Sequence, residues 1–191
     1  MRRLSSAGSL LCAVALVTAC ASTSPRMAGP PAPATTITAS QIEDAQRAWC
    51  GALLEISRLG TTGGDAKAYA ATVLSTAYDF DSGTVLFKPT LTFGAQTFRM
   101  SKEGALAYFV GGDPRYPDDT GFALKPWTGC RAVVEGTVIE GKIALAMGNV
   151  SLTDQSGKET VVDKSFGYRL AADGTLRIVL HHSSLPYVPG A

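Results

Sequence analysis

The alternation of apolar and polar residues divides the chain into a helical first half and a strand-rich second half. Apolar residues recur at three- and four-residue steps and predict a helix from Ser40 to about Arg58. Ser40, with Glu43 three residues later, has the spacing of a capping box at the start of this helix. Similar patterns predict a second helix over residues 65–78 and a third over residues 102–110, with Ser101 as the cap of the third.

The second half contains segments rich in β-branched and aromatic residues, joined by short turns with glycine. The predicted strands cover residues 84–87, 97–100, 131–140, 142–153, 159–170 and 175–182. Strands joined by such short turns pair as antiparallel hairpins. We therefore predict an α+β fold: a cone-shaped domain with N-terminal helices packed on a curved, mostly antiparallel sheet.

Residues 1–19 have the features of an export signal. A positive start is followed by a short apolar run, and small residues directly precede Cys20. This ending resembles the lipobox of bacterial lipoproteins, in which the cysteine is acylated and becomes the new N-terminus. We expect an exported protein, lipid-anchored to a bacterial cell membrane through Cys20, with its domain in the periplasm or cell envelope. The alternative is an ordinary signal peptide cleaved nearby.

Residues 20–38 are rich in Pro, Ala, Ser and Thr, so they predict a flexible tether between Cys20 and a domain at residues 39–191. The domain has the usual size of a single folding unit, about 150 residues. The net charge is +1 with no basic block, so nucleic acid is not an expected partner. Cys50 and Cys130 are the cysteines of this domain, and the sequence leaves open whether they form a disulfide or stay free thiols.

The chain has only two histidines, His181 and His182, and neighbours in a strand face opposite sides. A three-histidine zinc site within one subunit is therefore excluded, whereas mixed sites with cysteine or carboxylate ligands stay open. Strand alternation places His181 and Ser183 on one, more polar side. It places Ile178, Leu180 and His182 on the other side, which we predict to face the core.

Tyr108 lies on the third predicted helix, apart from its apolar face and among glycines and alanines. A large ring next to such small residues has open space beside it. One interpretation is a ring that lines a cavity, and the other is a surface tyrosine on a helix weakened by glycine.

Five segments together resemble the iota-class carbonic anhydrases. They are FKPT at residues 87–90, GALAYFVGG at 104–112, GFALKPW at 121–127, AMGN at 146–149 and HHSSLP at 181–186. The resemblance covers about residues 40–187. It implies the fold of the calcium/calmodulin-dependent kinase II association domain, within the nuclear-transport-factor-2-like (NTF2-like) cones. It also implies a lyase that reversibly hydrates CO₂ to bicarbonate.

The resemblance further implies which residues hold the substrate. In metal-free members bicarbonate is held by a threonine, a tyrosine and a serine, which correspond here to Thr90, Tyr108 and Ser183. Other members are described as using manganese or zinc, so we expect no cofactor but leave a metal open. Without a metal, another group has to accept the proton of the attacking water. His181, with an ordinary pKa near about 6.5, is the best candidate for this relay.

Two further expectations follow from the fold class. Cones of this kind also serve as non-catalytic modules that bind small ligands or assemble oligomers, which is the alternative function. Such cones commonly pair through the open sheet, so we expect a homo-oligomer, with a dimer favoured.

Overall fold

The computed structural model describes residues 36–190. The predicted signal peptide, Cys20 and most of the predicted tether lie outside these residues. The helices are α1 (Ala39–Thr62), α2 (Ala66–Ala77) and α3 (Lys102–Val110), with short 3₁₀ turns η1 (Gly94–Gln96) and η2 (Phe122–Leu124). The strands are β1 (Leu86–Lys88), β2 (Trp127–Glu140), β3 (Ile143–Asp154), β4 (Glu159–Leu170) and β5 (Leu176–Ser184).

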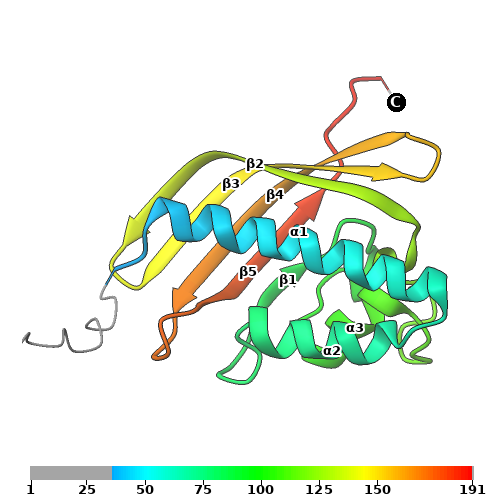
Figure 1. Cartoon of the computed structure of the whole chain (residues 1–191), viewed down its shortest axis with the longest axis horizontal. Helices are drawn as coiled ribbons and strands as arrows, with labels where there is room; N and C mark the ends of the chain where they lie inside the picture. Colours follow the sequence, from blue (N-terminus) through cyan, green and yellow to red (C-terminus); the bar gives the residue numbers. More distant parts are fainter. Residues whose placement is uncertain (1–35, 191) are drawn as a thin grey trace, which may run out of the picture. The chain divides into compact units, whose positions relative to one another are not determined.

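The strands form one five-stranded sheet in the order β1-β5-β4-β3-β2. The long strands β2 to β5 pair antiparallel, whereas the short β1 is parallel to β5. Figure 1 shows α1 lying across one face of the sheet, with α2 and α3 near β1. The core lies between this face and the helices, which confirms the predicted α+β class. Within residues 36–190, none of the helices has the length and apolar character needed to cross a membrane.

The start of α1 differs from the prediction. The capping residue is Thr38, whose side chain accepts a hydrogen bond from the backbone N–H of Gln41, and the Gln41 side chain completes the capping box. Ser40 and Glu43 are therefore not the capping pair. Threonine followed by glutamine has the same spacing, and Thr38 is the residue with the extended backbone that an N-cap requires.

Two other predicted boundaries are also corrected. Helix α1 continues past Arg58 to Thr62. The segment 97–100 is not a strand of the sheet: it is held by a backbone hydrogen bond of 2.8 Å from the Arg99 N–H to the Phe87 carbonyl. Its apolar and polar residues alternate as in a strand, but the neighbouring edge is only the short β1.

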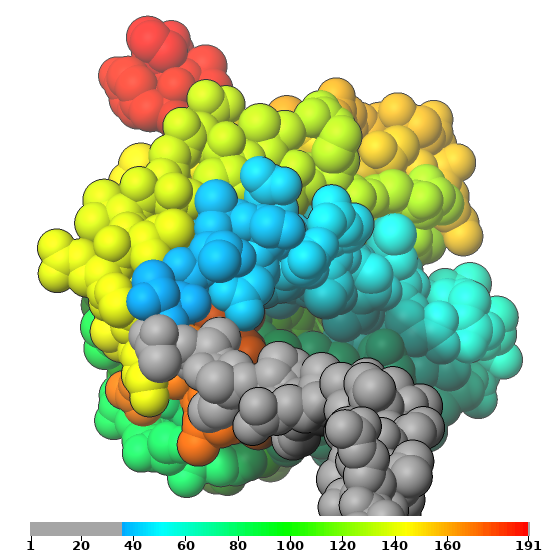
Figure 2. All heavy atoms as spheres, turned by 60° about the vertical axis from the view of Figure 1, so that its left-hand side comes forward, coloured from blue at the N-terminus to red at the C-terminus, as the bar shows by residue number. Residues whose placement is uncertain are grey.

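A disulfide joins Cys50 in α1 to Cys130 in β2. The two Cα atoms are 5.3 Å apart although 80 residues separate the cysteines in sequence. The sequence left this pairing open, and the structure shows that the thiols are bridged. In Figure 2 the first turns of α1 lie at the surface beside β2 and β3, and the disulfide fastens the helix to the first of these strands.

Strand β5 contains an irregularity that changes which residues face the core. Tyr168 of β4 pairs with Ile178, but the preceding Gly167 pairs with Leu180, so Val179 is an extra residue in β5. Such a bulge reverses the alternation of a strand. After Val179 the inward positions of β5 are therefore odd-numbered, and this reversal determines the orientation of the candidate site.

Candidate active site

The end of β5 directs His181 and Ser183 into the protein. His181 is 1% exposed and Ser183 is fully buried, whereas His182 is exposed. The prediction that His181 and Ser183 share one side is confirmed. The prediction that the side of His182 faces the core is wrong, because the bulge reverses the alternation after Ile178, which does face the core.

Thr90 meets Ser183 through the pairing of β1 with β5. Strand β1 is parallel to β5, with Phe87 beside His181, and the chain leaves β1 at Pro89 and turns at Thr90. The hydroxyl oxygens of Thr90 and Ser183 share a hydrogen bond of 2.6 Å. Both side chains are buried, so two hydroxyls from distant parts of the sequence meet in the interior.

Tyr108 lies on α3, which Ser101 caps as the sequence predicts. The Tyr108 side chain is 5% exposed; its ring stacks on Phe122 and packs edge-on against Phe87. The interpretation as a surface tyrosine is therefore wrong. Burial raises the pKa of the Tyr108 hydroxyl, and the nearby Thr90 side chain offsets this only in part. Tyr108 thus keeps its proton at neutral pH and is available as a hydrogen-bond donor.

The Tyr108 hydroxyl is buried, yet within residues 36–190 no group forms a hydrogen bond of good geometry with it. Thr90 is close enough to influence its pKa. An unpaired buried hydroxyl costs free energy, so natural proteins rarely keep one without a reason. Here the Tyr108 O–H lies near Thr90 and the backbone of Leu91 and is free to donate to a ligand.

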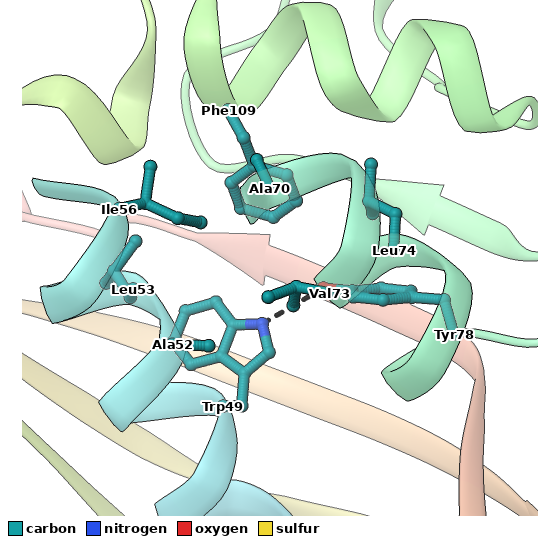
Figure 3. Close-up of a pocket in the computed structure, with 9 residues that line it drawn as sticks. All are labelled: Trp49, Ala52, Leu53, Ile56, Ala70, Val73, Leu74, Tyr78 and Phe109. Carbon is teal, nitrogen blue, oxygen red and sulfur yellow. Dashed lines mark hydrogen bonds between the residues drawn. The ribbon is translucent and has the colours of Figure 1, made fainter. Parts of the chain in front are cut away.

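A small apolar cavity lies between α1 and α2, and Figure 3 shows the side chains around it. The lining residues are Trp49, Ala52, Leu53, Ile56, Ala70, Val73, Leu74, Tyr78 and Phe109. The volume open to the centre of a water-sized sphere is about 10 Å³. None of the three hydroxyl residues lines this cavity. In the described part of the chain, the three hydroxyl residues are buried, and no cluster of three or more metal-ligating residues is present.

A second buried polar cluster connects helix α1 to strands β4 and β5. The Trp49 indole N–H donates to the Tyr78 hydroxyl over 3.0 Å, the bond drawn dashed in Figure 3. The same hydroxyl lies 2.9 Å from Nδ1 of His181, and the Lys164 Nζ lies 2.7 Å from Nε2 of that ring. Both ring nitrogens of His181 are therefore engaged.

Burial governs the ionisation of this cluster. It lowers the pKa of His181 well below its ordinary value, and the neighbouring charges of Lys164 and His182 act in the same direction. Burial also lowers the pKa of Lys164 to about 7. His181 was the candidate proton relay on the basis of its unperturbed pKa of about 6.5, and burial moves its pKa away from that value.

The sequence reasoning did not identify Lys164, Tyr78 or Trp49. For Lys164 a signal exists in the alternation of β4. The inward positions of this strand are occupied by Val162, Lys164, Phe166, Tyr168 and Leu170, all buried. Lys164 is the one charged residue in this row, and a charge at a core position points to a special role more often than a charge on the surface does. For Tyr78 and Trp49 no sequence pattern indicated the hydrogen bonds.

The arrangement of the helices on an open, mostly antiparallel sheet is that of the NTF2-like fold class. The structure is similar to that of an NTF2-like protein of unknown function from Pseudomonas putida, with a TM-score of 0.50 and 13% identity. The match covers 79% of this chain and 88% of that one. At this level of identity the likeness shows the fold alone.

Comparisons at the level of sequence identify the family of this chain within that fold class. Residues 40–185 match the family model described as metal-independent carbonic anhydrase. The chain is 47% identical over 153 residues to a metal-independent carbonic anhydrase from Nostoc sp. strain PCC 7120, covering 79% of this chain and 75% of that protein. It is also similar to the crystal structure of a cyanobacterial iota-carbonic anhydrase in complex with bicarbonate, with 45% identity, a TM-score of 0.81, and coverage of 84% of this chain and 99% of that one.

This chain therefore belongs to the metal-independent carbonic anhydrase family. The predicted family and enzyme class are confirmed. The expectation that no metal cofactor is needed agrees with the description of the family.

Proposed function

We propose that this chain reversibly hydrates CO₂ to bicarbonate at a site formed by the hydroxyls of Thr90, Tyr108 and Ser183. The main support is the 2.6 Å contact between the Thr90 and Ser183 hydroxyls, which joins positions 93 residues apart. The unpaired Tyr108 hydroxyl beside Thr90 adds a donor. The bicarbonate in the related cyanobacterial structure supports the same ligand for this chain.

The number of free hydroxyl hydrogens determines how many hydrogen bonds this site can donate to a substrate. In the bond between Thr90 and Ser183, one hydroxyl donates to the other, so the accepting hydroxyl keeps its own hydrogen for a ligand. Tyr108 supplies a second O–H. Two donors can stabilise the negative charge that grows on the CO₂ oxygens as water attacks the carbon, and hydroxyl lone pairs can accept a hydrogen bond from that water.

The test is stopped-flow CO₂ hydration by protein treated with a chelator. We expect Ser183→Ala and Thr90→Val each to lower kcat/KM by about 100-fold, the usual effect of losing one donor to a developing oxyanion. Ser184→Ala is the matched control, because Ser184 is the next residue in the same strand and its side chain points to the other face. Equal rates for Ser183→Ala and Ser184→Ala contradict the proposed site. An inactive wild type that still binds a small anion supports the non-catalytic binding module instead.

We also propose that the chain is exported and anchored through a lipid on Cys20, with the domain in the cell envelope. The support is the order of charge, apolar run and cysteine at the N-terminus. The disulfide between Cys50 and Cys130 fits an oxidising compartment. Labelled palmitate is expected to enter the wild type and not Cys20→Ser in a bacterial host. Equal labelling of both contradicts lipidation at Cys20.

We further propose a homodimer formed through the outer face of the sheet. Val138, Leu145 and Met147 point away from the helices and are 59%, 51% and 64% exposed, and Val138 pairs directly with Leu145. A second copy of the chain would remove this apolar face from water. Light scattering is expected to give a dimer mass for the wild type and a monomer mass for Met147→Lys. A monomeric wild type refutes the proposal.

A further inference from the structure

Hydration of CO₂ releases a proton, and the three hydroxyls of the candidate site cannot retain it. Alcohols and phenols are not bases at neutral pH, and burial makes the Tyr108 hydroxyl still harder to ionise. His181 is held neutral in the interior. The site therefore needs another group, close to the hydroxyls, that can take up a proton near neutral pH.

Lys164 lies in the right place for this task. In the register of the sheet it is directly opposite Ser183, and side chains of such a pair stand next to each other on the same face. Lys164 is 5% exposed, and its amine contacts Nε2 of His181 at 2.7 Å. The amine also lies 4.4 Å from the centre of the Trp49 ring and 5.8 Å from that of Phe166.

The surroundings of the amine do not include a compensating charge. Within residues 36–190 no carboxylate forms an ion pair with Lys164, and desolvation alone sets the direction of its pKa shift. The charged and titratable groups nearest to it on β5 are His181 and His182. Lys88 on β1 and Asp163 on β4 act on His182, which faces the other side. A buried amine without a counter-ion is stable as the neutral base.

The hydrogen-bond chain also favours a neutral amine. The Trp49 indole can only donate, so the Tyr78 oxygen accepts from it. The Tyr78 hydroxyl can then donate to Nδ1 of His181, and Nε2–H of the ring can donate to the lone pair of Lys164. The N–H groups of Trp49 and His181 and the O–H of Tyr78 then each find an acceptor. With a protonated Lys164, Nε2 has to accept, Nδ1 has to carry the hydrogen, and the Tyr78 hydroxyl loses its acceptor.

We propose that the neutral Lys164 amine, positioned by His181 and standing across from Ser183, accepts the proton that the attacking water loses. The inference rests on the proposed function. The water oxygen forms the new bond to the carbon of CO₂. The Nζ lone pair, which at rest accepts from Nε2–H of His181, turns toward Ser183, and the water proton passes through the Ser183 hydroxyl to Nζ. CO₂, water and the amine thus become bicarbonate and an ammonium group. The ammonium then returns the proton to buffer before the next turnover. Lys164 acts through Ser183 and is a positioning and proton-holding residue.

The pH profile of CO₂ hydration tests this role. We expect kcat/KM of the wild type to rise with an inflection near pH 7, as the pKa of Lys164 at about 7 implies. Lys164→Gln keeps a hydrogen-bonding group beside His181 but cannot take up a proton, so it is expected to lose the inflection and about 100-fold in rate. Lys164→Met tests the same loss without a polar group. Lys158→Gln, at the exposed turn between β3 and β4, is the control and is expected to match the wild type.

A second measurement separates this inference from the proposed function. Nitrogen-15 NMR of the lysine amines follows the titration of Lys164 in the folded wild type, with Lys164→Gln identifying the signal. Titration of Lys164 near the ordinary lysine value overturns the inference, as does a folded Lys164→Gln with the wild-type rate and inflection. If the wild type does not hydrate CO₂ at any pH, the proposed function fails and the catalytic role of Lys164 fails with it. A pH-independent loss of stability in both Lys164 variants, with the inflection retained, assigns Lys164 a structural role only.

Discussion

Removing the Tyr108 hydroxyl is expected to stabilise the protein and to impair its activity at the same time. The Tyr108 side chain is 5% exposed and its hydroxyl has no well-formed hydrogen bond among the described residues. Tyr108→Phe deletes this oxygen and leaves the ring on Phe122 and Phe87 unchanged. If the hydroxyl served packing alone, its removal would lower both the stability of the protein and its activity. A rise in stability combined with a fall in activity therefore identifies a hydroxyl that is retained for binding.

The magnitudes follow from the contacts. An unpaired buried hydroxyl costs about 1–3 kcal/mol, so we expect Tyr108→Phe to raise the free energy of unfolding by about 1 kcal/mol. At an unfolding entropy of about 2.1 cal/mol/K per residue, and about 155 residues in the described domain, this raises Tm by about 3 °C. In contrast, loss of one of two donors to the CO₂ oxygens lowers kcat/KM by about 100-fold.

The assays are thermal unfolding by circular dichroism and stopped-flow CO₂ hydration on the same preparations. Tyr168→Phe is the matched control. The Tyr168 hydroxyl is also buried without a well-formed hydrogen bond among residues 36–190, but Tyr168 lies on β4 outside the proposed site. We expect it to gain stability and to keep full activity. Reduced stability of Tyr108→Phe combined with unchanged hydration refutes the reasoning, because the hydroxyl would then serve the fold and not the substrate.

Three further predictions concern stability. Reduction of the Cys50–Cys130 disulfide, which closes a loop of 80 residues, is expected to cost roughly 4 kcal/mol in urea unfolding; equal midpoints with and without reductant contradict this. Gly148→Ala puts a methyl group 1.9 Å from the Val133 carbonyl oxygen, so we expect a loss of about 1–3 kcal/mol, and an unchanged Tm counts against it. Because burial lowers the pKa of Lys164 to about 7, the unfolded chain binds more protons between pH 7 and 10.5, so the free energy of unfolding is expected to rise with pH across this range. Lys164→Met removes this rise; an equally steep rise in that variant shows that other groups cause it.

Local patterns were sufficient for most of the fold. The third helix was predicted with its cap at Ser101, and β3 to β5 were predicted almost to their ends, because side-chain period and turn residues depend on neighbours in sequence. Strand β2 begins at Trp127, four residues before the predicted start at Arg131. Thr38 was missed as the cap of α1 because Ser40 offers the same chemistry two residues later. The disulfide stayed open because only tertiary packing brings α1 and β2 together.

The residues of the candidate site were predicted from the resemblance to the carbonic anhydrase family and not from local sequence patterns. Thr90 and Ser183 carry no local signal for their contact, which depends on the parallel pairing of β1 with β5. The bulge at Val179 reverses the alternation of β5, and no glycine or proline within β5 marks it. The environment of Lys164 is also non-local, because Trp49 and His181 come from other elements.

The pairing of β1 with β5 makes the site sensitive to how far folding has progressed. This edge strand has only three residues, and its partner residues follow more than 90 positions later. Contacts between such distant segments form slowly, because a long stretch of chain must first be closed into a loop. A partly folded chain can therefore hold its hairpins and still lack the Thr90–Ser183 contact. During refolding, recovery of CO₂ hydration is expected to lag behind recovery of the far-ultraviolet circular dichroism signal. Activity would then measure the formation of the β1–β5 pairing, the last step of folding.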